Sequence, residues 1–333
     1  MTKRKKVGLA LGSGAARGFA SIGVLKALRE IGVEPDFIGG TSMGALVGAF
    51  AAVDAIETLE EVAEQTDWKH LFGFFSDVVI PRDGLIDGKR IESFIRKYTG
   101  ERNIEDLKVP LKVVATDILT GEEVLIDSGN ILEAIRASIS IPGIFAPVRI
   151  GDRYLVDGAL VNPVPVNVVK NMGAQVVIAV DVNHFLFEGE IKEPAGDRKE
   201  EKRGRKKGRH LRISRSRAVD MDRITASLLR RFKGVDMTIL ESVRKWKERF
   251  KGPNIVEIML NSAHIKGYYI SKYMLELNPP DVVIAPPVGK IKLLEFHRAS
   301  EAIEAGYISA KEKEKEIIAA TGVRKTRRNK IKE

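Results

Sequence analysis

The sequence predicts a layered α/β fold with a largely parallel central sheet. Short apolar segments that indicate buried strands alternate with helical patterns along the chain. The first apolar segment, Val7–Leu11, is followed by a glycine-rich loop, a helix and a second strand at Phe37–Gly40, which is the order of a βαβ unit. A later strand is expected at 176–182, and a closing strand at 282–285 should complete the core.

The first helix is marked by an apolar stripe, because Val24, Leu28 and Ile31 recur at helical spacing. Gly32 follows at the position where a left-handed residue would end the helix. After the second strand, the segment Met43–Ile56 consists mostly of Ala, Gly, Leu and Val. This composition predicts a buried helix that packs closely on the sheet.

The middle of the chain is predicted to form a helix, a hairpin and a further helix. Residues 87–98 form an amphipathic pattern, and the segments 111–117 and 122–127 are joined by a glycine-containing turn. Asn130, with Glu133 three residues later, resembles a capping box and predicts the start of a short helix.

An aromatic cluster precedes these elements and has two interpretations. It could form a lid or a wall for an acyl chain, or it could be ordinary core, which we favour because aromatic side chains mostly lie in cores. Its members are Trp68, Leu71, Phe72, Phe74 and Phe75.

The second half of the chain predicts a strand at 151–156 that stops in a turn at Asp157-Gly158. Asn162-Pro163 indicates a helix start. Helical patterns occupy 219–250 and 255–277, and a final helix is expected from about Leu293.

The net charge of +10 is carried at the periphery of the sequence. Lys3 to Lys6 carry +4, the segment 191–217 carries +8 and the segment 322–333 carries +5, which leaves −7 for the remainder. An acidic body with basic appendages does not suggest a specific nucleic-acid partner, but it suits peripheral attraction to an anionic membrane. The segment 188–217 has few apolar residues, so we expect a disordered basic insertion there.

The chain of 333 residues contains no cysteine and five histidines. The lack of cysteine excludes disulfides and thiolate chemistry and is compatible with a reducing cytoplasm. No two histidines stand at metal-ligand spacing, so we expect neither a metal nor another cofactor. The early glycines and Arg17 interrupt the first apolar segment too soon for a secretory signal, and no apolar run approaches the roughly eighteen residues of a membrane span. We therefore expect a cytoplasmic protein with peripheral contact at the inner membrane face.

Ser42 is the candidate nucleophile. It lies where the second strand should turn into a helix, and Gly40, Ser42 and Gly44 match the Gly-x-Ser-x-Gly pattern of a nucleophile elbow. Small residues on both sides allow the tight backbone bend that exposes the hydroxyl.

The glycine-rich loop Gly12–Gly18 is a candidate oxyanion hole, because consecutive N–H groups at a helix start form a cradle for an anion. Within it, Arg17 could add positive charge or hold the loop by hydrogen bonding, and we favour the second role. The rival interpretation is dinucleotide binding, with Asp36 as the ribose-binding acid. We disfavour it because Asp36 precedes the second strand, whereas the ribose acid belongs at that strand's carboxyl end.

Two residues are candidates for the base that activates Ser42. His297 is late enough in the chain for a Ser-Asp-His triad, but it lies in a helical pattern rather than in a loop after a strand. Asp157 ends a strand and is better placed to act directly on the serine. A carboxylate with a pKa near 4 is a weak base for an alcohol unless burial raises that pKa, and an ordinary Asp-Gly turn is the alternative interpretation.

Three motifs in order resemble the motif set of the patatin-like phospholipase family, in its bacterial branch similar to neuropathy target esterase. They are the loop Gly12–Gly18, the elbow Gly40–Gly44 and the sequence Asp157-Gly158-Ala159. The resemblance implies a three-layer α/β/α fold, a Ser-Asp dyad without histidine, and metal-independent hydrolysis of lipid acyl esters. It implies Ser42 as nucleophile and Asp157 as base, with an oxyanion loop at Gly12, Ser13, Gly14, Ala15, Arg17 and Gly18. Ser13 stands where the family often has glycine, but a serine keeps its N–H unless the position requires a positive φ.

The sequence thus predicts a serine acyl hydrolase of the esterase, phospholipase A or lysophospholipase type, with a lipid or ester as substrate. A non-catalytic lipid-binding or regulatory module on the same fold and an acyltransferase are the alternatives. The expected organisation is a catalytic core at 5–187, the basic insertion at 188–217, a helical extension with the closing strand and helix at 218–321, and a basic tail at 322–333. The sequence indicates no oligomeric state.

Overall fold

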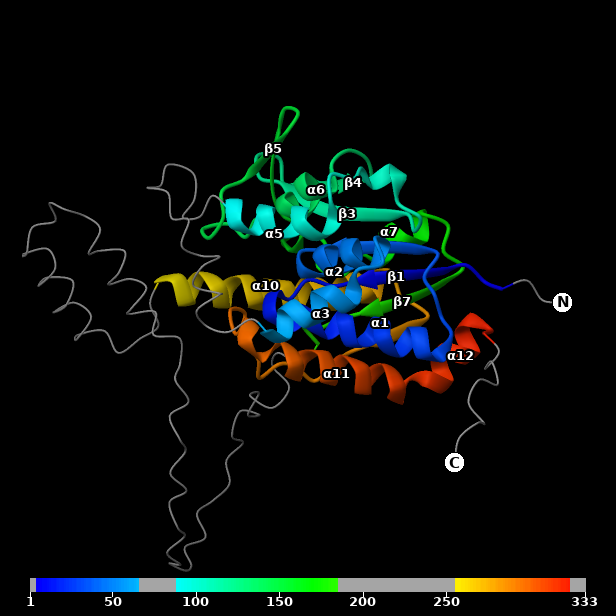
Figure 1. Ribbon diagram of the computed structural model, residues 1–333. Coiled ribbons are helices and arrows are strands. Elements are labelled where there is room, and N and C mark those ends of the chain that lie inside the picture. The colour runs from blue at the N-terminus through cyan, green and yellow to red at the C-terminus, as the bar shows by residue number, and fades with distance from the viewer. Residues whose placement is uncertain (1–3, 66–87, 185–254, 324–333) are drawn as a thin grey trace, which may run out of the picture. The chain divides into compact units, whose positions relative to one another are not determined.

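The computed structural model describes residues 4–65, 88–184 and 255–323 (Figure 1). Most of them belong to one compact unit, residues 1–191 and 260–333. A second unit, residues 192–259, is described only at its end, where helix α10 (Ile255–Leu277) begins. The aromatic cluster at 68–75, the basic segment 188–217 and the helical pattern 219–250 lie outside the described residues.

The sheet of the described chain is mixed and mostly parallel. Its strands run in the order β5-β6-β3-β2-β1-β7-β8, with β4 paired to β3. The pairs from β3 through β2, β1 and β7 to β8 are parallel, whereas β4, β5 and β6 join by antiparallel pairing. The strands are β1 (Val7–Leu11), β2 (Phe37–Thr41), β3 (Leu111–Asp117), β4 (Glu123–Ile126), β5 (Val148–Ile150), β6 (Arg153–Asp157), β7 (Val176–Val180) and β8 (Val282–Ile284).

Helices cover both faces of this sheet (Figure 1), which confirms the predicted three-layer α/β/α fold. Along β1 the side chains alternate, so that Leu9 and Leu11 join the larger core and Ala10 joins a smaller core against α7 and α10. The other described helices are α1 (Ala20–Ile31), α2 (Met43–Ala52), α3 (Ile56–Gln65), α5 (Lys89–Thr99), α6 (Ile131–Ser138), α7 (Val166–Asn171), α11 (Ala299–Glu312) and α12 (Glu314–Thr321).

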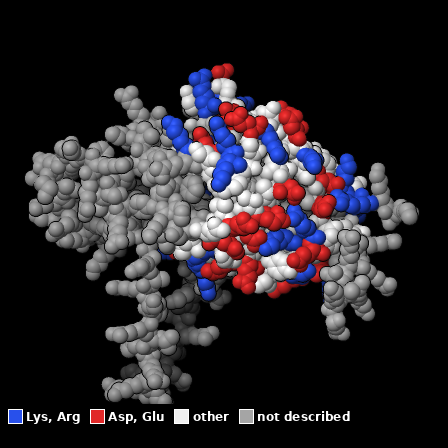
Figure 2. All heavy atoms as spheres, in the orientation of Figure 1, with Lys and Arg blue, Asp and Glu red and all other residues white. Residues whose placement is uncertain are grey.

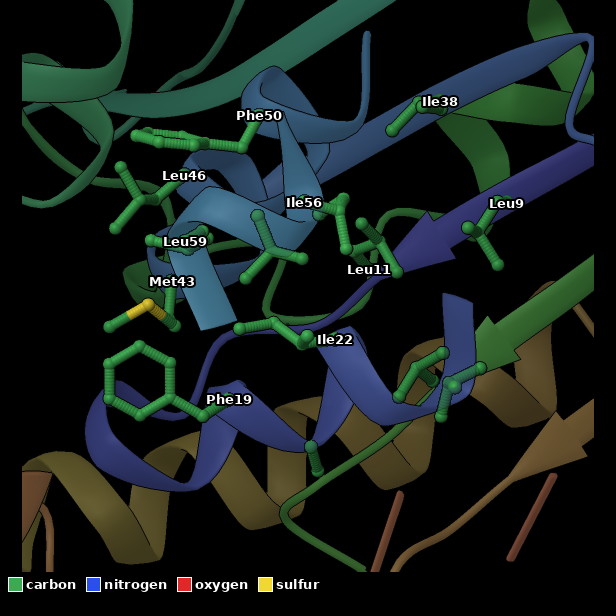
Figure 3. Close-up of a cluster of buried hydrophobic side chains, with 14 of the residues drawn as sticks. Leu9, Leu11, Phe19, Ile22, Ile38, Met43, Leu46, Phe50, Ile56 and Leu59 are labelled. Atoms are coloured by element: carbon green, nitrogen blue, oxygen red, sulfur yellow. The ribbon is translucent and has the colours of Figure 1, made fainter. Parts of the chain in front are cut away.

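The larger core joins the first two strands to α1, α2 and α3. Figure 3 shows Leu9, Leu11 and Ile38 on the strands facing Ile22, Phe50 and other apolar side chains of these helices. The stripe predicted for α1 is buried, and Gly32, at φ 87°, ends that helix as expected.

Helix α11, from the far end of the sequence, packs directly on α1. A Cβ on Gly23 would overlap the carbonyl oxygen of Ile303, and one on Gly306 would overlap that of Ala20. Glycine at both positions lets the two helix backbones touch, which fixes the C-terminal helix against the N-terminal one.

Several boundaries differ from the sequence-based expectation. The helix expected over 43–56 ends at Ala52, because Asp54 adopts a left-handed conformation (φ 58°), and α3 follows as a separate, unpredicted helix. Helix α7 starts at Val166 rather than near 162, since Pro163 and Pro165 precede it. Strand β5 was not predicted, and the last long helix begins at Ala299 rather than near 293.

Among the described helices, none has the length and apolar character needed to cross a bilayer. The face of the molecule in Figure 2 carries both signs of charge, with acidic side chains gathered over α1 and α3 beside basic ones. One such pair is Lys26 and Glu60, whose charged atoms lie 2.6 Å apart. Basic side chains also gather on the upper part of this face (Figure 2).

Candidate active site

The elbow at Ser42 is a sharp and strained turn. Strand β2 ends at Thr41, α2 starts at Met43, and Ser42 between them has φ 57° and ψ −122°, which is unusual for a residue with a side chain. A Cβ on Gly44 would overlap the carbonyl oxygen of Leu11, and one on Gly40 would lie 2.6 Å from Cα of Ala45 in the first turn of α2. The glycines of the predicted motif are therefore required by close backbone approach.

The side chains of Ser42 and Asp157 meet in the structure. The Oγ of Ser42 donates a 2.6 Å hydrogen bond to Oδ2 of Asp157, although 115 residues separate them in the sequence. Strand β3 explains the meeting, since it pairs Val114 with Thr41 and Ala115 with Asp157. The residue after Thr41 and the residue at the end of β6 are thereby brought together.

Burial makes Asp157 a stronger base than an ordinary aspartate. The loss of solvent raises its pKa from 3.8 to about 6, against the hydrogen bonds from Ser42 and from the N–H of Ala159 and the positive charge of Lys266. The bond from Ala159 to Oδ1 (2.8 Å) also makes Asp157 the cap of a short turn. The Asp-Gly turn and the contact with Ser42 thus coexist.

Two hydroxyl groups that the sequence analysis missed support this pair. The Oγ of Ser138 accepts a hydrogen bond from the N–H of Ser42 (2.8 Å) and donates one to the carbonyl of Val114 (2.6 Å). The hydroxyl of Thr116 donates to the carbonyl of Asp157 (3.0 Å). Neither residue belongs to a spacing motif, and the only signal for Ser138 was its place in a short helix rich in Ala and Ser.

The glycine-rich loop lies beside the elbow, at the carboxyl end of β1. The N–H of Gly12 donates to Val180 O (3.0 Å) and that of Ser13 to Pro163 O (2.8 Å). Within the described part of the chain, the N–H groups of Gly14 and Ala15 have no acceptor. These two donors remain available to an anion.

The loop keeps Ser13 without strain. The left-handed residue of the loop is Ala15 (φ 47°), and Ser13 has no positive φ. Gly18 is needed for packing, because a Cβ there would lie 2.5 Å from Cγ of Met43, the residue that follows the nucleophile. The loop and the elbow are thus in direct contact.

Arg17 points into the protein and is 1% exposed. Its Nη2 lies 2.8 Å from Nε2 of His264 on α10. Burial lowers the pKa of Arg17 to about 10, and the nearby carboxylate of Asp181 opposes that change. This position fits the structural role favoured for Arg17.

The rejected candidates lie elsewhere. His297 is exposed on a short 3₁₀ turn, Phe296–Arg298, whereas the hydroxyl of Ser42 is bonded to Asp157. Asp36 accepts hydrogen bonds from Arg4 and from the N–H of Val7, which places it at the amino end of β1. In the described ranges, no three His, Cys, Asp or Glu side chains gather in a way that could hold a metal ion.

Comparisons with known proteins identify the family of the chain. The patatin-like phospholipase family model matches residues 9–170, a range that contains the loop, the elbow and Asp157. An uncharacterised NTE family protein of Mycobacterium tuberculosis is 32% identical over 328 residues, which cover 90% of this chain and 89% of that protein. Patatin-like phospholipase domain-containing protein 7 of Rattus norvegicus is 36% identical over 181 residues, which cover 53% of this chain and 13% of that protein. The chain therefore belongs to the patatin-like phospholipase family, among its NTE family proteins.

Proposed function

We propose that the chain is a serine acyl hydrolase that cleaves lipid acyl esters through the pair Ser42 and Asp157. The observation that carries this proposal is the 2.6 Å hydrogen bond from Ser42 Oγ to Asp157 Oδ2 at a strained elbow. A serine hydroxyl needs an adjacent base to become a nucleophile, and strained turns cluster at active sites. Membership of the patatin-like phospholipase family supports an acyl ester as the substrate.

In the acylation step, Ser42 Oγ attacks the ester carbonyl carbon while Asp157 Oδ2 takes the hydroxyl proton. The tetrahedral intermediate then expels the alcohol, which receives that proton from Asp157, and the acyl group remains on Ser42. In deacylation, Asp157 takes a proton from water, the hydroxide attacks the acyl carbon, and the proton returns to Ser42 as the fatty acid leaves. A pKa of about 6 suits Asp157 both to accept and to return the proton, because a general acid or base works best when its pKa lies near the operating pH.

We propose that the oxyanion of both intermediates is stabilised by the N–H groups of Gly14 and Ala15. The other residues of the loop act differently, since the N–H groups of Gly12 and Ser13 already donate to carbonyl oxygens. Gly18 leaves space for the side chain of Met43, and Arg17 anchors the loop through the contact of its buried side chain with His264. All charges and protons of this scheme are handled by the chain's own groups, so we propose that it uses no metal and no cofactor.

The test is covalent labelling with a fluorophosphonate, together with release of fatty acid from phospholipid, lysophospholipid and simple ester substrates. We expect one adduct per chain at Ser42 in the wild type, no adduct in Ser42→Ala, and much slower labelling in Asp157→Asn. Ser300→Ala, which changes an exposed serine of α11, is the matched control and should label normally.

Three outcomes would contradict the proposal. Ester turnover that Ser42→Ala leaves unchanged would favour the non-catalytic lipid-binding module. An adduct at another serine would move the nucleophile. Acylated product that accumulates in place of free fatty acid when an alcohol acceptor is supplied would favour an acyltransferase.

We also propose a cytoplasmic location with peripheral contact to anionic membranes. The support is the charge of +8 in the segment 191–217, which lies outside the described residues. Deleting this segment should weaken binding to anionic vesicles at low salt, and equal binding by the deletion variant would refute the idea.

A further inference from the structure

The N–H groups of Gly14 and Ala15, which have no acceptor in the described part of the chain, are each oriented by the carbonyl of the preceding residue. In a trans peptide the carbonyl and the N–H point in opposite directions, so fixing one fixes the other. The carbonyl of Ser13, which shares a peptide plane with the N–H of Gly14, accepts a 3.0 Å hydrogen bond from Nδ2 of Asn183. The carbonyl of Gly14, which shares a plane with the N–H of Ala15, accepts a 3.1 Å bond from the N–H of Arg17.

Among the described residues, the side chain of Arg17 has one hydrogen-bond partner, His264. Its Nε and Nη1 are buried without an acceptor among the described residues, so the contact of Nη2 with His264 is the hydrogen bond that its side chain makes. A buried cation with so few partners is held in place only as firmly as that bond allows.

The chemistry of the contact fixes the state of His264. A guanidinium has only donors, so Nε2 of His264 must accept and the ring proton must sit on Nδ1. Burial, and then the charge of Arg17, lower the pKa of His264 to about 3. The lowered pKa keeps the ring of His264 neutral near pH 7, so that its Nε2 can accept the hydrogen bond there.

We infer that Asn183 and His264 are positioning residues of the oxyanion hole. Asn183 aims the N–H of Gly14 directly, and His264 aims the N–H of Ala15 through Arg17. Both come from elements that follow the family-matched range 9–170: Asn183 follows strand β7, and His264 lies on α10. Asn183 is itself fixed by a bond from its N–H to Asp181 Oδ1 (2.9 Å). This inference rests on the proposed function.

The test compares His264→Phe, which keeps a ring without an acceptor, with His264→Gln, which restores a neutral acceptor, and with Asn183→Leu. Removing one oxyanion donor costs about 10²- to 10³-fold in kcat, so misaiming one should cost roughly 10- to 100-fold at nearly constant KM. His264→Gln should recover most of that loss. Tyr273→Ala, at an exposed position of α10, is the control and should keep wild-type turnover of a water-soluble ester.

Labelling with a fluorophosphonate separates misaiming from misfolding. The final labelling stoichiometry counts folded active sites, whereas the labelling rate depends on the oxyanion hole. His264→Phe and Asn183→Leu should therefore label completely but slowly. Wild-type rates in both variants, a rise in KM alone, or no rescue by His264→Gln would overturn the inference. Failure of the proposed function would instead appear as absence of labelling in the wild type.

Discussion

Two buried aspartates lie on the two sides of the proposed site and have different neighbours. Asp157 ends β6 on the elbow side, and Asp181 follows β7 on the loop side; burial raises the pKa of both carboxyl groups. Asp157 accepts a hydrogen bond from the hydroxyl of Ser42. Asp181 accepts one from the N–H of Asn183 and lies near the positive charge of Arg17. The comparison teaches that burial alone does not make a base. The adjacent hydroxyl suits Asp157 for the proposed proton transfer, whereas the groups next to Asp181 are an N–H donor and the side chain of Arg17.

The largest expected effect comes from exchanging each carboxylate for an amide. Asp157→Asn should lower kcat by roughly 10⁴- to 10⁶-fold, because the amide cannot take the proton of Ser42 and loss of the base in a serine protease costs about 10⁶-fold. Asp181→Asn should lower kcat by less than about tenfold, since it touches only the support of the loop. Steady-state kinetics with one soluble ester measures kcat of both variants. Equal losses of kcat would contradict the distinction between the two aspartates.

The second effect concerns stability and has the opposite direction. The pKa of Asp157 is higher in the folded protein than the value of 3.8 expected when unfolded, so its contribution to stability is full below pH 4 and is lost as the pH rises through about 6. A rise of this size corresponds to roughly 3 kcal/mol at most. Asp157→Asn replaces the buried carboxylate by a neutral amide, so it avoids the stability lost when Asp157 ionises. The variant should therefore unfold at higher urea concentration than the wild type at pH 8. A variant that is less stable than the wild type at pH 8 would contradict the assigned burial cost.

The third effect is on the pH dependence of activity. As the proposed base, Asp157 has to be ionised, so kcat/KM should be constant above pH 7 and should fall about tenfold per pH unit well below 6. The same midpoint should appear in Asp181→Asn, and His264, whose pKa is about 3, should not contribute. A midpoint that lies near 6 in the wild type but moves away from 6 in Asp181→Asn would mean that the wrong aspartate had been assigned as the base.

The smallest effect compares the strained residue on each side. Ser42 (φ 57°) and Ala15 (φ 47°) both have a Cβ in a left-handed conformation, which glycine adopts without strain. Ser42→Gly should therefore be more stable than Ser42→Ala by about 1 kcal/mol, and Ala15→Gly more stable than the wild type by a similar amount. Chemical denaturation measures both pairs. A gain in stability at only one of these two positions would show that the backbone at the other position is not strained.

Sequence patterns predicted the elements that depend on local chemistry. The strands at 7–11 and 37–41, the helix that Gly32 ends, the cap at Asn130 and the span of α10 all follow from residues close together in the chain. The motif resemblance also led to the pair Ser42 and Asp157, whose contact the structure contains. Their catalytic roles stay predictions.

The supporting contacts were beyond the sequence because each joins distant segments. Ser138 lies 96 residues from Ser42, Asn183 lies 170 from Ser13, and His264 lies 247 from Arg17. None of the three residues stands in a recognisable pattern, and only the order of strands in the sheet brings them to the site.

The central place of β1 has a consequence for how the protein is made. Of the described strands, β1 is made before the others and β2 follows soon afterwards, but the other neighbour of β1 begins only at Val176, and the helix that covers α1 begins only at Ala299. At typical synthesis rates of about 5–20 residues per second, the open edge of β1 would wait roughly ten to thirty seconds for β7. A nascent chain with an unpaired strand and an uncovered apolar helix face is a natural client for chaperones. A fragment cut at residue 170 would keep that exposed edge permanently.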